Sequence, residues 1–189
     1  GTVRAVVTNS VSGSIEQGAS TLTQQYVKNY LLYVDAETET DRLKATEQTP
    51  ARKLKEAQIA LQLEQSLSKD EILTRYLNIV PFGNGAAGIA SAARTYFGST
   101  PAELTVPQAA LLAGMVRSTT ATDPVQNPQA ALDRRNLVIQ QMLEQQMIDQ
   151  AQADEALAQP LGIASPLNTQ ANGCIGAGPA GFFCQYVQE

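Results

Sequence analysis

Two short stretches of the sequence hold residue types suited to binding a compact anion. In the first, Ser20 and Thr21 precede a helical pattern, so the free backbone N–H groups of a helix start would face a ligand above them. Further polar side chains follow in the same pattern, namely Gln24, Gln25 and Lys28. Gln25 and Lys28 are three residues apart and so share one helix face. Taken alone, the stretch is more simply explained as an ordinary capped helix.

The second stretch is Arg52-Lys53-Leu54-Lys55-Glu56, in which Arg52 and Glu56 are four residues apart on one helix face. The simpler interpretation is a surface ion pair, worth roughly a few tenths of a kcal/mol. The alternative is a carboxylate held beside fixed cations, an arrangement suited to organising a phosphate leaving group and a sugar. Spacing alone favours the surface ion pair.

The composition favours helices as the elements that position these residues. Ala, Leu and Gln abound and aromatic residues make up only 5% of the chain, so the prediction is an all-α fold. The expected helices cover 21–33, 50–67, 69–80, 86–97, 101–104, 106–116, 128–147 and 150–158. The stretch Val3–Val7 could be a strand or the end of a helix.

Local signals mark the expected helix starts. Four pairs fit capping boxes: Thr21 with Gln24, Ser68 with Glu71, Thr100 with Glu103, and Thr105 with Gln108. Pro50, Pro101 and Pro128 each stand at a first helical position behind Thr or Asn. Two apolar faces are expected, the first from Ile72, Leu73, Tyr76, Leu77 and Val80, and the second from Ile139, Met142, Leu143 and Met147.

Two stretches break the helical periodicity. Residues 34–49 are polar and acidic and are expected to form a surface loop or a short helix. Residues 163–189 are richer in Gly and Pro, which marks a linker or the start of a following domain. The predicted domain that precedes this stretch therefore covers 1–162.

Composition also excludes several classes of function. The chain contains no His, which excludes Ser-His-Asp triads and His-based zinc sites within it. The net charge of −5 and the lack of a long basic run argue against nucleic acid as a partner. Cys174 and Cys184 could be free thiols or a disulfide, and their Gly-rich flanks favour the disulfide.

Taken together, the stretches resemble the glycosyltransferase domain of class A penicillin-binding proteins, glycosyltransferase family 51. The stretches that match the family's ordered motifs are Gly18–Asn29, Arg52–Glu56, Ile72–Asn78 followed by Phe82-Gly83, and Leu112–Gly114. The Asp-Pro and Asn-Pro pairs at 123–124 and 127–128 fit the segment after the last motif. Four ordered motifs are a far stronger signal than any one of them.

The resemblance implies a lysozyme-like helical domain with a small jaw subdomain at the outer face of the bacterial cell membrane. Its implied reaction polymerises lipid II into glycan strands, with inversion at the anomeric carbon and release of polyprenyl pyrophosphate. By the match to the third motif, Glu56 would be a catalytic residue beside the leaving pyrophosphate. A divalent cation, Mg²⁺ or Mn²⁺, is a candidate cofactor. No metal site formed by protein side chains is expected. The implied substrate-binding residues are Ser20, Thr21, Gln24, Gln25, Lys28, Arg52, Lys53 and Asn78. Lipid II, the growing glycan chain and other cell-wall synthesis proteins are the implied partners.

The sequence departs from the family's pattern in three places. Ala19 replaces a Gly, Pro81 replaces a Tyr, and the first motif, which carries the general-base Glu, would lie before Gly1. We therefore expect the 189-residue chain by itself not to polymerise lipid II, because a general base typically contributes about a hundred- to ten-thousand-fold. The acidic stretch before Pro50 resembles actinobacterial members, and the membrane anchor is expected outside the chain.

Two other functions compete with this one. A lytic transglycosylase-like enzyme would share the fold and the glycan but would not need both phosphate-site motifs. A catalytically inactive helical scaffold that binds lipid II would retain them. In the full-length glycosyltransferase, replacing Glu64, which lies beyond the third motif, is expected to change activity little.

Overall fold

The computed structural model describes residues 20–169, and its chain divides into two compact units, residues 1–80 and 81–189. Within the described part of each unit the regular structure is helical, with one isolated bridge between Pro81 and Ala87 and no strand. The predicted all-α fold is confirmed.

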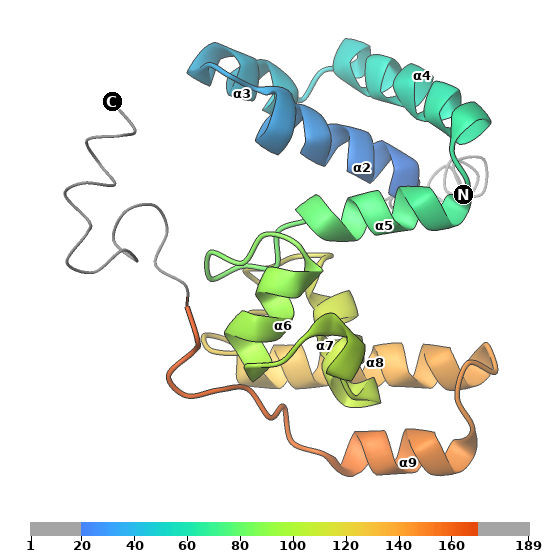
Figure 1. Ribbon diagram of the computed structural model, residues 1–189, viewed down its shortest axis with the longest axis vertical. Coiled ribbons are helices and arrows are strands. Elements are labelled where there is room, and N and C mark those ends of the chain that lie inside the picture. The colour runs from blue at the N-terminus through green and yellow to red at the C-terminus, as the bar shows by residue number, and fades with distance from the viewer. Residues whose placement is uncertain (1–19, 170–189) are drawn as a thin grey trace, which may run out of the picture. The chain divides into compact units, whose positions relative to one another are not determined.

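Between residues 20 and 80, the first unit contains four α-helices and one π-helical segment (Figure 1). They are α2 (Leu22–Tyr30), the π segment η1 (Leu31–Asp35), α3 (Glu39–Thr46), α4 (Pro50–Ser66) and α5 (Lys69–Ile79). The single helix predicted over 21–33 thus changes to π geometry at Leu31. The acidic stretch, predicted as a loop or a short helix, contains the short helix α3. Hydrogen bonds from Thr38 lower the pKa of Asp41 and start this helix.

Helix α2 packs against both α4 and α5 and supplies much of the first unit's core. Val27 of α2 is buried, as are Ile72, Tyr76 and Val80 at and just beyond α5. The last three are spaced by four residues, so α5 buries a narrow stripe. Leu73 was predicted on the same face but is 42% exposed, because it is rotated by about 100° from Ile72.

The second unit contains α6 (Ile89–Phe97), the 3₁₀ turn η2 (Pro101–Glu103), α7 (Val106–Met115), α8 (Pro128–Glu144) and α9 (Gln150–Ala158). Helix α8 packs against both α7 and α9. Ala110 of α7, Ile139 of α8 and Ala153 of α9 belong to one core cluster, so small side chains let the three helices approach closely.

Two helix ends differ from the prediction. α6 begins at Ile89 rather than at residue 86, because the Ala86 N–H donates to the Gly83 carbonyl in a turn. α8 ends at Glu144 rather than at 147, because the chain turns with Gln146 at a φ of +57°. Met147 therefore leaves the predicted apolar face and is 70% exposed.

All four predicted capping boxes are present, and the three prolines stand at helix starts. Asn127 precedes α8, but its side chain makes no capping hydrogen bond to that helix. Its side-chain N–H donates instead to the Thr120 carbonyl at 3.0 Å. Two further boxes, Thr38 with Asp41 and Asp149 with Gln152, were missed. They pair Thr with Asp and Asp with Gln, outside the Ser/Thr-x-x-Glu/Gln pattern.

Two expectations about the chain ends lie outside the described residues: the secondary structure of Val3–Val7 and the pairing of Cys174 with Cys184. The boundary at residue 162 stays a prediction. Backbone bonds from Ala164 to Tyr96 and from Asn168 to Thr95 tie the following residues to α6. Among the described helices, none is long and apolar enough to cross a membrane.

The disulfide remains a testable prediction. We expect Cys174 and Cys184 to be bonded when the chain is produced in an oxidising compartment, so its mass should be about two protons below that of the reduced chain. Mass spectrometry under non-reducing conditions measures this difference. Two thiols that react with an alkylating reagent in the native protein would contradict the pairing.

Candidate functional site

The first unit contains a cavity of about 500 Å³ with three cationic side chains in its wall. Lys28 comes from the last turn of α2, and Arg52 and Lys53 come from the first turn of α4. The other lining residues are Thr46, Gln48, Thr49 and Pro50. We call this hollow the cation cavity, and it joins Lys28 of the second motif to Arg52 and Lys53 of the third.

The start of α4 adds backbone donors to the same cavity. Thr49 is the N-cap, and its hydroxyl accepts from the Arg52 N–H at 3.3 Å. Pro50 stands at the first helical position, where its missing N–H leaves no hydrogen bond unmade. Because the positive end of the helix dipole lies at this start, it adds to the field of the three side chains.

Glu56 lies one turn further along α4 and forms an ion pair with Arg52. The Arg52 side chain is 14% exposed and the Glu56 side chain is 9% exposed. The pair is therefore largely buried, whereas spacing alone favoured a surface ion pair. Arg52 also donates to the Glu47 carbonyl. A buried carboxylate needs such a partner, and the pair in turn fixes the guanidinium at the cavity wall.

The other polar residues of the second motif lie away from the cation cavity, at the start of α2. The Thr21 hydroxyl accepts a hydrogen bond from the Gln24 backbone N–H at 3.2 Å, and the Gln24 side-chain oxygen accepts one from the Thr21 backbone N–H at 3.0 Å. Ser20, just before them, is exposed. Seven residues separate Thr21 from Lys28, about 10 Å along the helix axis. The structure therefore places Lys28 with Arg52 and Lys53, and not at the helix start with Ser20 and Thr21.

Gln25 faces α5 rather than the cation cavity. Its side-chain oxygen accepts a hydrogen bond from the Tyr76 hydroxyl at 3.3 Å, and burial raises the pKa of Tyr76. Asn78, also on α5, is exposed and is not in the wall of the cation cavity. Their predicted roles in substrate binding stay predictions.

A second cavity of the first unit, about 420 Å³, lies at the start of α2, and we call it the Thr23 cavity. Its wall consists of Thr21, Leu22, Thr23, Glu64, Leu67, Lys69 and Ile72. The Thr23 hydroxyl donates to the Glu64 carboxylate at 2.5 Å. The sequence assigned no role to Glu64, because a contact across 41 residues leaves no trace in local spacing.

The turn that contains Phe82 and Gly83 is held by side chains that the sequence did not single out. The Tyr96 hydroxyl donates to the Phe82 carbonyl at 2.8 Å, and Asn84 donates to Tyr96 and Asp123 at 3.0 and 3.1 Å. Gly83 has a φ of +81°, which favours glycine. These bonds set the backbone course next to Pro81.

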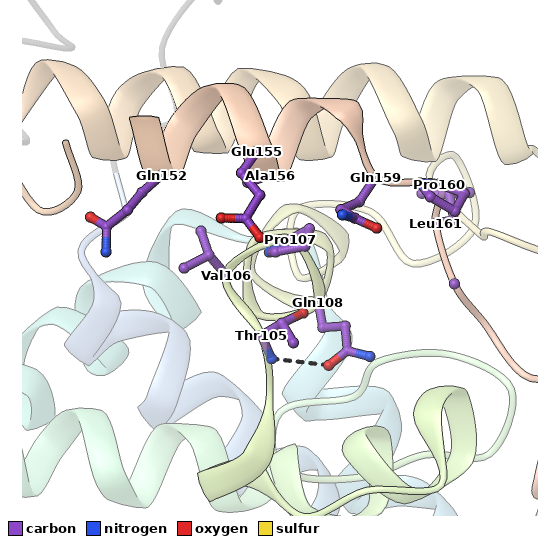
Figure 2. Close-up of a pocket in the computed structure, with 11 residues that line it drawn as sticks. Thr105, Val106, Pro107, Gln108, Gln152, Glu155, Ala156, Gln159, Pro160 and Leu161 are labelled. Atoms are coloured by element: carbon purple, nitrogen blue, oxygen red, sulfur yellow. Dashed lines mark hydrogen bonds between the residues drawn. The ribbon is translucent and has the colours of Figure 1, made fainter. Parts of the chain in front are cut away.

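The second unit has a cavity of about 430 Å³ between the first turn of α7 and α9. Figure 2 shows Val106 and Pro107 on one side, facing Glu155 and Gln159 of α9 on the other. No cationic side chain lines it, and none of the predicted site residues does either. The cation cavity is therefore the better candidate for an anionic ligand.

The described residues do not fit a protein-held divalent cation. Within residues 20–169, no group of three His, Cys, Asp or Glu side chains could hold a metal ion. Glu56, one helical turn beyond Arg52 on α4, is already paired with Arg52.

Comparisons with known proteins identify the family of the chain. The family model described as Transglycosylase matches residues 1–143. Penicillin-binding protein 1A of Neisseria lactamica is 44% identical over 144 residues, which are 76% of this chain and 16% of that protein. Penicillin-binding protein 1A of Neisseria flavescens is 41% identical over 161 residues, 85% of this chain and 19% of that protein.

A solved structure is also similar, the 2.6 Å crystal structure of penicillin-binding protein 1A from Haemophilus influenzae. Its TM-score is 0.49 at 26% identity, and the match covers 75% of this chain and 17% of that one. The chain thus spans less than a fifth of the length of these relatives. Because the family model matches about three quarters of the chain, the chain belongs to the transglycosylase family of class A penicillin-binding proteins.

Proposed function

We propose that the chain is part of a peptidoglycan glycosyltransferase and that its cation cavity binds the pyrophosphate of the lipid-linked glycan donor. The observation that carries the proposal is the meeting of Lys28, Arg52 and Lys53 at the N-terminus of α4. The whole protein would polymerise lipid II with inversion and release polyprenyl pyrophosphate.

Charge development explains why such a cavity would serve this reaction. As the anomeric bond breaks, its electron pair moves to the pyrophosphate oxygen, so negative charge on the leaving group increases. Fixed cations and helix-start N–H groups then stabilise the transition state more than the ground state. Lys28, Arg52 and Lys53 would supply that charge.

Glu56 would act on the leaving-group side of the reaction. It holds the Arg52 guanidinium in place and already shares its charge with that cation, so it is poorly suited to remove the proton of the attacking hydroxyl. The proton would go to the first-motif Glu that the resemblance implies. Ser20, Thr21, Gln24, Gln25 and Asn78 would contact the sugars or the second phosphate.

The relatives favour glycan synthesis over the glycan-cleaving alternative, because they are penicillin-binding proteins. The inactive scaffold that binds lipid II would use the same cavity and differs only in turnover. By family, the working location is the outer face of the cell membrane, with lipid II, the glycan chain and other cell-wall synthesis proteins as partners.

Binding of farnesyl pyrophosphate to the 189-residue chain tests the proposal without needing the general base. We expect saturable binding in isothermal titration calorimetry, weakened about tenfold by Lys28→Ala, because one charge-assisted contact is lost. Rising salt should weaken binding as well.

Lys55→Ala is the matched control, since Lys55 lies two residues after Lys53 on α4, is exposed, and does not line the cavity. It should change the affinity less than about twofold, as expected for a screened charge. Equal losses from Lys28→Ala and Lys55→Ala would mean non-specific attraction. A wild-type chain that binds no pyrophosphate would contradict the proposed function.

A further inference from the structure

Helices α2 and α4 meet at two places along their lengths, with opposite ends paired (Figure 1). The last turn of α2 and the first turn of α4 share the cation cavity, through Lys28, Arg52 and Lys53. The first turn of α2 contacts the far end of α4 through Thr23 and Glu64. The two helices therefore run in opposite directions.

The second contact is well placed to hold α2 in register. Thr23 is only 5% exposed, so its hydroxyl needs a partner within the protein. Glu64 is exposed, but its carboxylate reaches that hydroxyl at 2.5 Å, as a charged acceptor does. Its negative charge also lies at the first turn of α2, where the helix dipole favours it.

We propose that Glu64 is a positioning residue, which through Thr23 sets the register of α2 against α4 and thereby the spacing of Lys28 from Arg52 and Lys53. This inference rests on the proposed function. Thr23 lies about 8 Å from Lys28 along α2, and Glu64 lies about 18 Å from Arg52 along α4. Because both helices are rigid over these distances, a slip at Thr23 would move Lys28 relative to Arg52 and Lys53.

The residues on α5 do not replace this contact. The Tyr76 hydroxyl holds Gln25 at 3.3 Å, but this bond joins α2 to α5 and does not link α2 to α4. Within residues 20–169, Thr23 and Glu64 form a side-chain hydrogen bond that links α2 to α4 away from the cation cavity.

The test measures farnesyl pyrophosphate affinity of the 189-residue chain by calorimetry. Glu64→Ala and Thr23→Val should each weaken binding about fivefold, because a small misplacement of one contact lowers affinity. The double variant should be no weaker than either single one, since both changes remove the same contact. Thr23→Ser keeps the hydroxyl and should restore binding to within about twofold of wild type.

Two further measurements separate a positioning role from loss of folding. Far-UV circular dichroism must show that each variant is folded, and Thr23→Val, which removes the same hydrogen bond from the other side, carries the test if Glu64→Ala unfolds. Glu144→Ala removes an exposed carboxylate at the end of α8 and should leave affinity unchanged. Backbone amide resonances of Lys28, Arg52 and Lys53 should shift in Glu64→Ala without any ligand.

The outcomes distinguish this inference from the proposed function. Folded Glu64→Ala and Thr23→Val variants that bind pyrophosphate as wild type does would overturn the positioning role. If wild type itself binds no pyrophosphate, the proposed function fails, and the ligand-free amide shifts alone decide whether Glu64 sets the register. Unshifted resonances at Lys28, Arg52 and Lys53 would then overturn it.

Discussion

Replacing Glu56 with Gln should lower glycan polymerisation about a hundredfold or more in a protein that carries the complete glycosyltransferase domain. The substitution keeps the shape and removes the charge that holds Arg52 at the wall of the cation cavity. Losing one preorganised charged group at a site of developing charge typically costs about a hundred- to a thousandfold in turnover. Steady-state polymerisation of labelled lipid II measures the change.

The control for this substitution is Glu144→Gln, which alters an exposed carboxylate at the end of α8. It should leave turnover within about twofold of wild type. Arg52→Ala should reduce both turnover and pyrophosphate affinity, because Arg52 lines the cavity and partners Glu56. If Glu56→Gln and Glu144→Gln both fold and both leave turnover unchanged, Glu56 is only one partner of a structural ion pair.

Replacing Arg135 with Ala should destabilise the protein by about 3 kcal/mol, the largest stability effect that we expect. The side chain is 1% exposed and donates to the carbonyls of Leu157, Gln159 and Pro160, at 3.3, 2.6 and 3.0 Å. These carbonyls end α9, where a cation also meets the negative end of the helix dipole. Each hydrogen bond from a charged donor contributes about 1.5–3 kcal/mol.

Urea denaturation followed by circular dichroism measures this effect. Arg135→Lys should cost less than Arg135→Ala but still more than about 1 kcal/mol, because an ammonium cannot reproduce the planar fork that reaches three carbonyls. Burial lowers the pKa of Arg135, yet a guanidinium remains charged at neutral pH. Arg117→Ala, at an exposed position, should stay within about 0.5 kcal/mol. An Arg135→Ala variant as stable as Arg117→Ala would contradict the assignment.

Local signals in the sequence determined the helical framework and the family. Capping boxes depend on residues three apart, so Thr21 with Gln24 and Ser68 with Glu71 could be read directly from the chain. The ends of α6 and α8 could not, because they depend on a turn bond from Ala86 and on the backbone of Gln146. Ordered motifs identified the family because they combine many weak local signals.

Only the tertiary structure decided which of the predicted site residues lie together. Spacing along one helix could not show that Lys28 meets Arg52 and Lys53 while Thr21, on the same helix, lies about 10 Å away. The burial of the Arg52 and Glu56 pair likewise depends on what packs around α4. The four-residue spacing could not show it, because a surface ion pair on a helix has the same spacing. The contact of Thr23 with Glu64 spans 41 residues, so it exists only because α2 and α4 pack side by side in opposite directions.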